Sequence, residues 1–177
     1  MNRYVPITLC ALLALPAAAQ DVTDADRAAI DERIETLGDA ATEWDIEGMT
    51  EVVPPEVFVY QAEQVGLEPD ALKTMMAEAL EGVAATVQIE SFDMDLDAAT
   101  EGATSTGRPY LLIPTETVMD IEGAGRVRAE THTLALEAND DWWLVRIDEL
   151  PQVQALRAVY PDFAGVEFPG GTMEALE

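Results

Sequence analysis

Three side chains in the second half of the chain have the types that acid/base chemistry needs: His132, Glu116 and Glu130. His132 is the only histidine, and an unperturbed imidazole changes charge closer to neutral pH than other side chains do. A carboxylate that reaches it through a hydrogen bond can share in proton transfer as a general acid or base. These three residues are the candidate catalytic set, provided that the fold brings them together.

Four more side chains are candidates for binding a ligand beside this set: Tyr110, Arg128, Arg146 and Trp142. Alternate residues of a strand share a face, so a common inward face of three successive strands would place them around one polar pocket. The alternative is that this face is the solvent side of the sheet, where opposite charges pair across strands. The residues of opposite parity are more apolar, which favours solvent or a partner for the charged face.

The motifs of other chemistries are missing. Ser91 and Ser105 are the only serines, and neither lies between glycines as a nucleophile elbow requires. The Gly123–Gly125 turn lacks the lysine of a phosphate-binding loop, and the acidic run Asp93–Asp97 lacks the glycine and glutamate of a calcium loop. A single histidine does not specify a zinc site. The sequence therefore predicts neither a metal nor a cofactor.

Residues 1–19 have the pattern of a secretory signal peptide, with Arg3 before a short apolar run and small residues up to Ala19. Cleavage is predicted between Ala19 and Gln20, so we expect a periplasmic or extracellular protein. The only cysteine, Cys10, lies in this segment, which leaves the mature chain without a thiol. No later segment is apolar over the ~20 residues of a membrane anchor.

The chain carries 35 acidic and nine basic residues, for a formal net charge of −26. Such a surface repels phosphate backbones and anionic headgroups, which excludes nucleic acid as a partner. The length fits one domain, residues 20–164, followed by a loosely docked C-terminal tail, residues 165–177.

Helical spacing predicts three N-terminal helices. The first begins with a capping box at Thr23 and Asp26 and ends at Trp44-Asp45, and the second spans Ile46 to Val53. Pro54-Pro55 then stops the second helix, and an extended connection with Val57, Phe58 and Tyr60 is expected. The third helix runs from Pro69 to a C-terminal cap at Gly82, and its Met75-Met76 pair is assigned to the core.

Beyond Gly82 the apolar period becomes two, which predicts strands. The first begins at Val87 with a bulge near Glu90-Ser91, and a turn over 101–107 leads to strands 110–121, 126–137 and 142–148. Short connections favour an antiparallel meander. A short helix follows from Leu150, and of the Trp142-Trp143 pair Trp143 is assigned to the core.

This order predicts an α+β fold in which a curled antiparallel sheet of about four strands wraps around N-terminal helices. It resembles the nuclear transport factor 2-like superfamily, the SnoaL-like, cystatin-like cone shared with ketosteroid isomerases and scytalone dehydratase. The matching segments are Glu43–Met49, Pro54-Pro55, Trp142–Asp148 and Leu156–Phe163, the last similar to exported members of uncharacterised function. The resemblance covers about Asp21 to Tyr160.

The fold hosts enzymes, carriers and dimerisation modules, so three hypotheses stay open. The leading one is an exported domain that binds a small ligand or a partner protein without catalysis. The first alternative is a small isomerase, dehydratase or hydrolase that uses His132 with Glu116 or Glu130. The second is a structural homodimer whose cone is filled by its own side chains.

Overall fold

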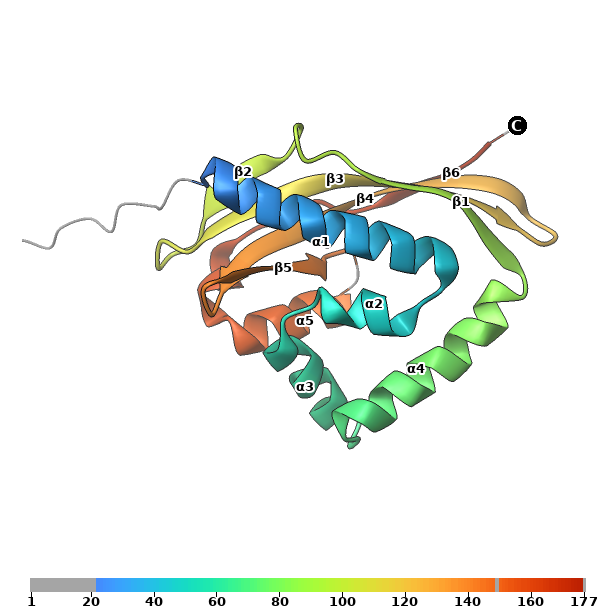
Figure 1. Cartoon of the computed structure of the whole chain (residues 1–177), viewed down its shortest axis with the longest axis horizontal. Coiled ribbons are helices and arrows are strands. Elements are labelled where there is room, and N and C mark those ends of the chain that lie inside the picture. Colours follow the sequence, from blue (N-terminus) through green and yellow to red (C-terminus); the bar gives the residue numbers. More distant parts are fainter. Residues whose placement is uncertain (1–21, 149, 177) are drawn as a thin grey trace, which may run out of the picture.

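The computed structural model describes residues 22–148 and 150–176 as an α+β fold, with helices N-terminal to a curled antiparallel sheet in a cone-like arrangement (Figure 1). The fold class expected from the sequence is confirmed. The predicted signal peptide, residues 1–19, and its cleavage site lie outside the described residues. No helix in the described part of the chain has both the length and the apolar character of a membrane span.

The first two helices follow the sequence prediction. Helix α1 (Asp24–Glu43) begins with the expected capping box, in which Thr23 Oγ1 accepts from the Asp26 amide at 3.2 Å and Asp26 Oδ2 accepts from the Thr23 amide at 2.8 Å. It ends at Trp44 in the left-handed conformation, with φ of 59°. Helix α2 (Ile46–Glu51) packs closely on α1, because a Cβ on Gly48 would lie 2.7 Å from the Ala40 Cβ.

The segment after Pro54 corrects the prediction of an extended connection. Helix α3 (Pro55–Gln64) contains Val57, Phe58 and Tyr60. Proline lacks an amide hydrogen, so Pro55 is tolerated at the start of a helix, where that hydrogen has no intrahelical partner. The prolines therefore stop α2 and also begin α3. Gly66, with φ of 71°, follows the end of α3.

Helix α4 (Pro69–Ala84) runs two residues past Gly82, so the predicted cap at Gly82 is wrong. Gly82 does not adopt the positive φ that distinguishes a glycine cap. Leu72 is the only buried residue of α4, and it packs on Phe58 and Ala62 of α3. Figure 1 shows α4 running from α3 to the sheet. The helix is thus anchored mainly at its N-terminal end.

The main sheet has the order β1-β3-β4-β5 and is antiparallel, as predicted. Its strands are β1 (Val87–Met94), β3 (Pro109–Ile121), β4 (Gly125–Ala138) and β5 (Asp141–Arg146). The predicted bulge is present, because the β1–β3 register shifts between Ile89 and Ser91.

Two short strands extend this sheet beyond the prediction. Strand β2 (Thr100–Ala103) pairs with β3, although residues 101–107 were expected to form a turn. Strand β6 (Thr172–Ala175) pairs with β4 and lies within the expected loose tail. Most of their residues are exposed, so neither strand carries the apolar alternation that reveals a strand in a sequence.

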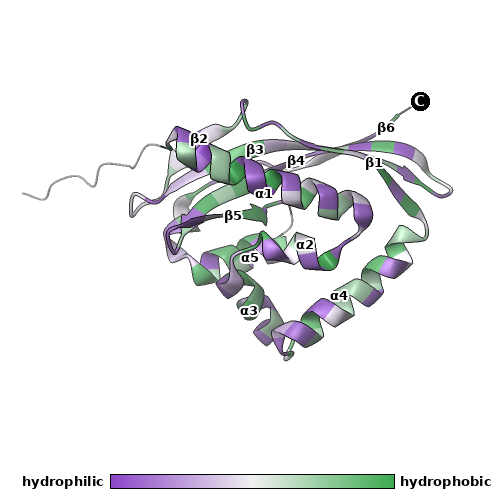
Figure 2. Ribbon diagram, in the orientation of Figure 1, coloured by the Kyte–Doolittle hydropathy of each residue, from purple (hydrophilic) through white to green (hydrophobic). Residues whose placement is uncertain are grey.

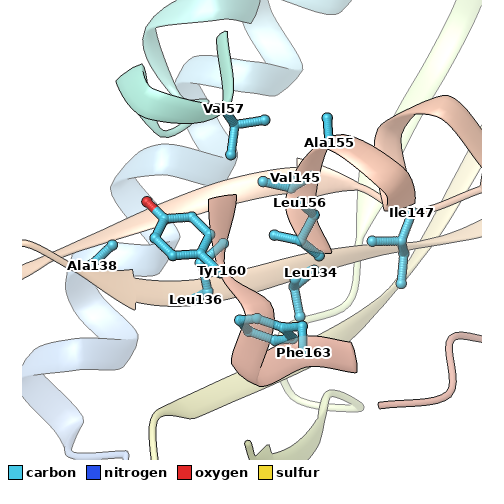
Figure 3. Packing of buried hydrophobic residues seen from close by; sticks show 10 residues of the cluster. All are labelled: Val57, Leu134, Leu136, Ala138, Val145, Ile147, Ala155, Leu156, Tyr160 and Phe163. Atoms are coloured by element: carbon cyan, nitrogen blue, oxygen red, sulfur yellow. The ribbon is translucent and has the colours of Figure 1, made fainter. Parts of the chain in front are cut away.

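Helices cover both faces of the sheet. Helix α1 packs on the face that carries Leu111 and Leu144, and Figure 2 shows the hydrophobic residues alternating with hydrophilic ones along α1. Helix α5 (Leu150–Val159) and the short helix η1 (Pro161–Gly165) cover part of the opposite face. There Phe163 packs beside Leu134 and Leu136 of β4 (Figure 3). Each cluster is a separate layer of the core.

The tryptophan pair of β5 has the opposite burial from the one predicted. Trp142 is 4% exposed in the α1 layer, where its Nε1 donates to Asp26 Oδ1 at 2.9 Å. Trp143 is only half-buried, and the Arg33 guanidinium carbon lies 4.3 Å from its ring centroid. Because side chains alternate along a strand, the two indoles must lie on opposite faces of β5. The packing of α1 on one face determines which of them is buried.

Candidate functional site

An apolar cavity of about 370 Å³ lies among α2, α3, α4 and the edge of β5. The β5 edge is held against the end of α2 by a hydrogen bond of 2.8 Å from the Leu144 amide to the Val52 carbonyl. The volume falls within the range of about 300–1,000 Å³ that is typical of small-molecule sites. This cavity is the candidate functional site.

Helix α4 supplies one wall of the cavity through Met76, Ala79 and Leu80. Residues three and four apart lie on the same face of a helix, so these side chains form one apolar stripe. Met76 lines the cavity and also packs against the cluster of Phe58, Ala62 and Leu72, whereas Met75 is 47% exposed, so the assignment of the pair to the core is wrong only for Met75. Beyond this contact of Met76, the stripe faces the cavity.

The opposite walls are almost wholly aliphatic and come from segments far apart in the sequence. They include Ile46, Met49, Val52, Val53, Val57, Leu144 and Val145, together with Leu37 of α1. Phe58 is the only aromatic residue in the lining. Such walls suit an apolar ligand, because binding removes aliphatic surface on both partners from water.

Two threonines in the lining already use their hydroxyl hydrogens within the protein. Thr50 Oγ1 donates to the Ile46 carbonyl at 2.9 Å. Thr115 Oγ1 donates to the Ile113 carbonyl at 3.1 Å, so in the 3.0 Å contact between Thr115 and Thr133 the hydrogen comes from Thr133. Each lining hydroxyl is left with an acceptor lone pair for a ligand.

Gln152 of α5 also lines the cavity, and its Oε1 is buried without a hydrogen-bond partner among the described residues. A buried amide oxygen that has lost water and gained no partner costs free energy. A ligand with a polar head group can supply the missing hydrogen bond.

Arg146 is the only charged residue in the cavity lining, and Asp148 neutralises it. Arg146 Nε donates to Asp148 Oδ1 at 3.2 Å and a terminal nitrogen donates to Oδ2 at 2.5 Å. The Asp148 side chain is 13% exposed, whereas that of Arg146 is 58% exposed. The pair is a two-pronged contact between a planar guanidinium and a carboxylate.

The predicted catalytic residues lie elsewhere, in an open groove on the β1–β3–β4 part of the sheet. Glu116 and Glu130 are directly opposite in the β3–β4 register, and His132 is opposite Pro114, so all three share one face. They line the groove together with Asp93 of β1. The structure thus brings these three residues together, although no hydrogen bond joins His132 to either glutamate in the described part of the chain.

Exposed ion pairs surround this groove. Arg128 Nε lies 3.1 Å from Glu116 Oε2, and its NH1 donates to Glu174 at 3.1 Å. Glu130 accepts a longer bond of 3.4 Å from Thr172 of β6. Within the described residues, no three metal-binding side chains form a group that could hold an ion.

The other predicted ligand-binding residues are divided among different places. Arg146 is opposite Thr133 in the β4–β5 register, which puts it on the face away from His132 and into the cavity lining. Tyr110 lies against Phe163, with ring centroids 5.6 Å apart, in the layer covered by η1. Trp142 belongs to the α1 layer. The seven residues therefore do not form one pocket.

Sequence reasoning missed the cavity because apolar residues of a wall and of a packed core look alike. The segment that became α3 was expected to be extended, which hid the wall that Val57 and Phe58 provide. The available signal was the apolar stripe of α4.

No protein-family model matches the chain, and no curated protein matches it significantly. The resemblance to the nuclear transport factor 2-like superfamily remains a prediction.

Proposed function

We propose that this protein binds a small apolar ligand in the cavity beside α4 and carries out no chemistry on it. The observation that carries the proposal is the apolar stripe of α4, which faces a hollow lined by aliphatic side chains. Apolar surface that remains hydrated costs roughly 25 cal/mol per Å² compared with buried surface. A ligand that fills the cavity removes this cost.

The composition of the lining favours binding over catalysis. It contains no histidine, carboxylate, cysteine or lysine, and its single arginine is paired with Asp148. Acid/base or nucleophilic catalysis needs such a group in contact with the substrate. We also propose that the protein is an exported member of the nuclear transport factor 2-like superfamily, on the basis of its N-terminal sequence and its cone-like arrangement.

Acid/base catalysis in the His132 groove is the second candidate. Its supporting observation is that His132 Nδ1 is buried without a partner in the described structure, beside Glu116 and Glu130. The Glu116 side chain is 44% exposed, however, and the groove is open to solvent. The partly enclosed apolar cavity is therefore the better supported site.

The test uses the protein from Gln20 onward and N-phenylnaphthylamine, an uncharged dye that fluoresces in apolar surroundings. We expect saturable binding that Leu80→Asp weakens by about tenfold or more, because a buried carboxylate opposes an apolar ligand. Glu78→Gln, at an exposed position on the same helix, is the matched control and should bind like the wild type. Absence of saturable binding, or equal loss in both variants, would refute the proposal.

A third variant separates the two candidate sites. His132→Ala lies outside the cavity lining, so dye binding should be unchanged. A turnover assay that detects product with the wild type and fails with His132→Ala would favour the groove instead. Circular dichroism of every variant checks that the fold is intact.

A further inference from the structure

The cavity has one positive charge in its lining, and the protein itself occupies that charge. Two of the Arg146 nitrogens are bound by the two oxygens of Asp148. Asp148 has no other hydrogen-bond partner among the described residues, so its carboxylate is committed to this contact. An incoming carboxylate would have to displace it.

We propose that the cavity selects uncharged aliphatic alcohols and rejects carboxylates with the same chain. This inference rests on the proposed function and names the class of ligand. Three features of the cavity support this selectivity: the aliphatic walls, the hydrogen bonds that the polar side chains already make, and the pairing of Arg146 with Asp148.

The walls decide the apolar part of the ligand. Phe58 is the only aromatic residue in the lining, so flat rings find no second ring to stack on. The methionines of α2 and α4 have flexible, unbranched side chains that adapt to the outline of a chain. A flexible aliphatic chain therefore fits these walls better than an aromatic system.

The polar lining decides the head group. The hydroxyls of Thr50 and Thr133 already donate hydrogen bonds within the protein, so they can only accept a hydrogen bond from a ligand. Gln61 and Gln152 contribute amides to the lining, and the buried Gln152 oxygen has no partner among the described residues. A hydroxyl both donates and accepts, so it can satisfy the threonines and either orientation of the Gln152 amide, whereas a carboxylate can only accept.

The charges in and around the cavity disfavour an anionic ligand. A carboxylate that approaches Arg146 also approaches Asp148, and it enters a chain with a formal net charge of −26. Two carboxylates that share one arginine repel each other, and both lose hydration in the partly enclosed site. An uncharged head group avoids both costs.

The test compares three probes with one dodecyl chain: dodecanol, dodecanoate and dodecyltrimethylammonium. Each displaces N-phenylnaphthylamine from the protein at about pH 8, where the fatty acid is ionised in water. We expect dodecanol to bind about tenfold more tightly than dodecanoate. The carboxylate of dodecanoate cannot make a charge-assisted contact with Arg146 while Asp148 occupies it. The cationic probe tests the general effect of the acidic surface, and it should also bind more weakly than dodecanol because the lining offers it no free carboxylate.

Asp148→Asn is the decisive variant. It releases Arg146, so binding of dodecanoate should tighten by about tenfold while binding of dodecanol changes little. In the double variant Arg146→Gln with Asp148→Asn, this gain should disappear. Asp148→Asn must keep the wild-type circular dichroism, and dodecanol binding itself reports that the cavity is intact.

The outcomes distinguish this inference from the proposed function. Dye binding with dodecanoate equal to or tighter than dodecanol in the wild type would overturn the selectivity and leave the binding site in place. No change of preference in Asp148→Asn would overturn the role of the Arg146–Asp148 pair. Failure of the dye to bind saturably would overturn both proposals, because displacement of the dye is the readout for all three probes.

Discussion

Arg108 and Asp162, which are 54 positions apart in the chain, form an ion pair in which Arg108 Nε donates to Asp162 Oδ2 at 2.9 Å. The same oxygen accepts from the hydroxyls of Thr104 and Thr106 at 2.9 and 3.0 Å. The Asp162 side chain is only 8% exposed. One carboxylate therefore fixes η1 to the connection between β2 and β3.

Removing this charge should destabilise the protein. Asp162→Asn leaves Arg108 partly buried without its counter-charge, and we expect a loss of about 2–4 kcal/mol in the free energy of unfolding. Glu101→Gln is the matched control, because its ion pair with Arg27 is exposed and should contribute less than about 1 kcal/mol. Urea unfolding measures both values. Equal losses in the two variants would show that Asp162 is no more important than a surface charge.

Asp162 should also make stability depend on pH in the acid range. Burial raises the pKa of its carboxyl, but hydrogen bonds from Arg108, Thr104 and Thr106 outweigh burial and hold the pKa below its ordinary value of 3.8. The unfolded state then binds more protons than the folded state, so this contribution is present above about pH 4 and is lost as the pH falls through the lower folded pKa.

Hydrogen bonds from Thr23 lower the pKa of Asp26, and a bond to its own backbone amide lowers that of Glu56, so these carboxyls act in the same direction. Urea unfolding between about pH 5 and pH 2 should therefore show falling stability. The slope should be shallower for Asp162→Asn. Parallel curves would mean that Asp162 does not contribute to the acid response.

Two glycines in helices should respond to alanine in opposite ways. At Gly48 the new Cβ would lie 2.7 Å from the Ala40 Cβ, and the overpacking of α2 on α1 should cost about 1–3 kcal/mol. At Gly82 nothing lies within 4 Å, and the substitution should stabilise α4 by about 0.5–1 kcal/mol. Thermal unfolding compares the two variants, and a stable Gly48→Ala protein would contradict this packing of the two helices.

Helix α4 should be protected by the ligand. With one buried residue, it has little tertiary packing beyond its N-terminal end, and such segments open locally at low free energy. Dodecanol should slow amide hydrogen exchange in the half of α4 that contains Met76 and Leu80. Exchange in α1, which is packed on the sheet, is the internal reference. Equal protection of both helices would indicate global stabilisation without closure on the ligand.

The sequence predicted elements best where one local signal had one meaning. The capping box at Thr23 fixed the start of α1, and the parity change near Glu90 located the bulge of β1. The proline pair after α2 had two meanings, because Pro55 both ends one helix and begins the next. The local sequence could not decide whether a helix begins at Pro55, because α3 is stabilised by the tertiary packing of Val57 and Phe58.

The candidate site was less predictable because it depends on where apolar surfaces fail to meet. The charged residues around His132 were correctly placed on one face by strand parity. Arg146 was assigned to that same face, and the β4–β5 register places it on the other. The Asp148 contact and the cavity beside α4 result from the tertiary arrangement of seven helices and strands, which periodicity alone does not report.

The C-terminal strand has a consequence for self-association. Strand β5 pairs with β4 only from Thr133 to Ala138, and β6 takes up the same side of β4 from Val127 to Glu130. The tail thus covers backbone amides and carbonyls that would otherwise be an open template for a neighbouring chain. Glu174 places a negative charge on this covering strand. A longer open edge of β4 is thus replaced by the edge of a four-residue, charged strand, and short, charged edges disfavour edge-to-edge pairing with a neighbouring chain.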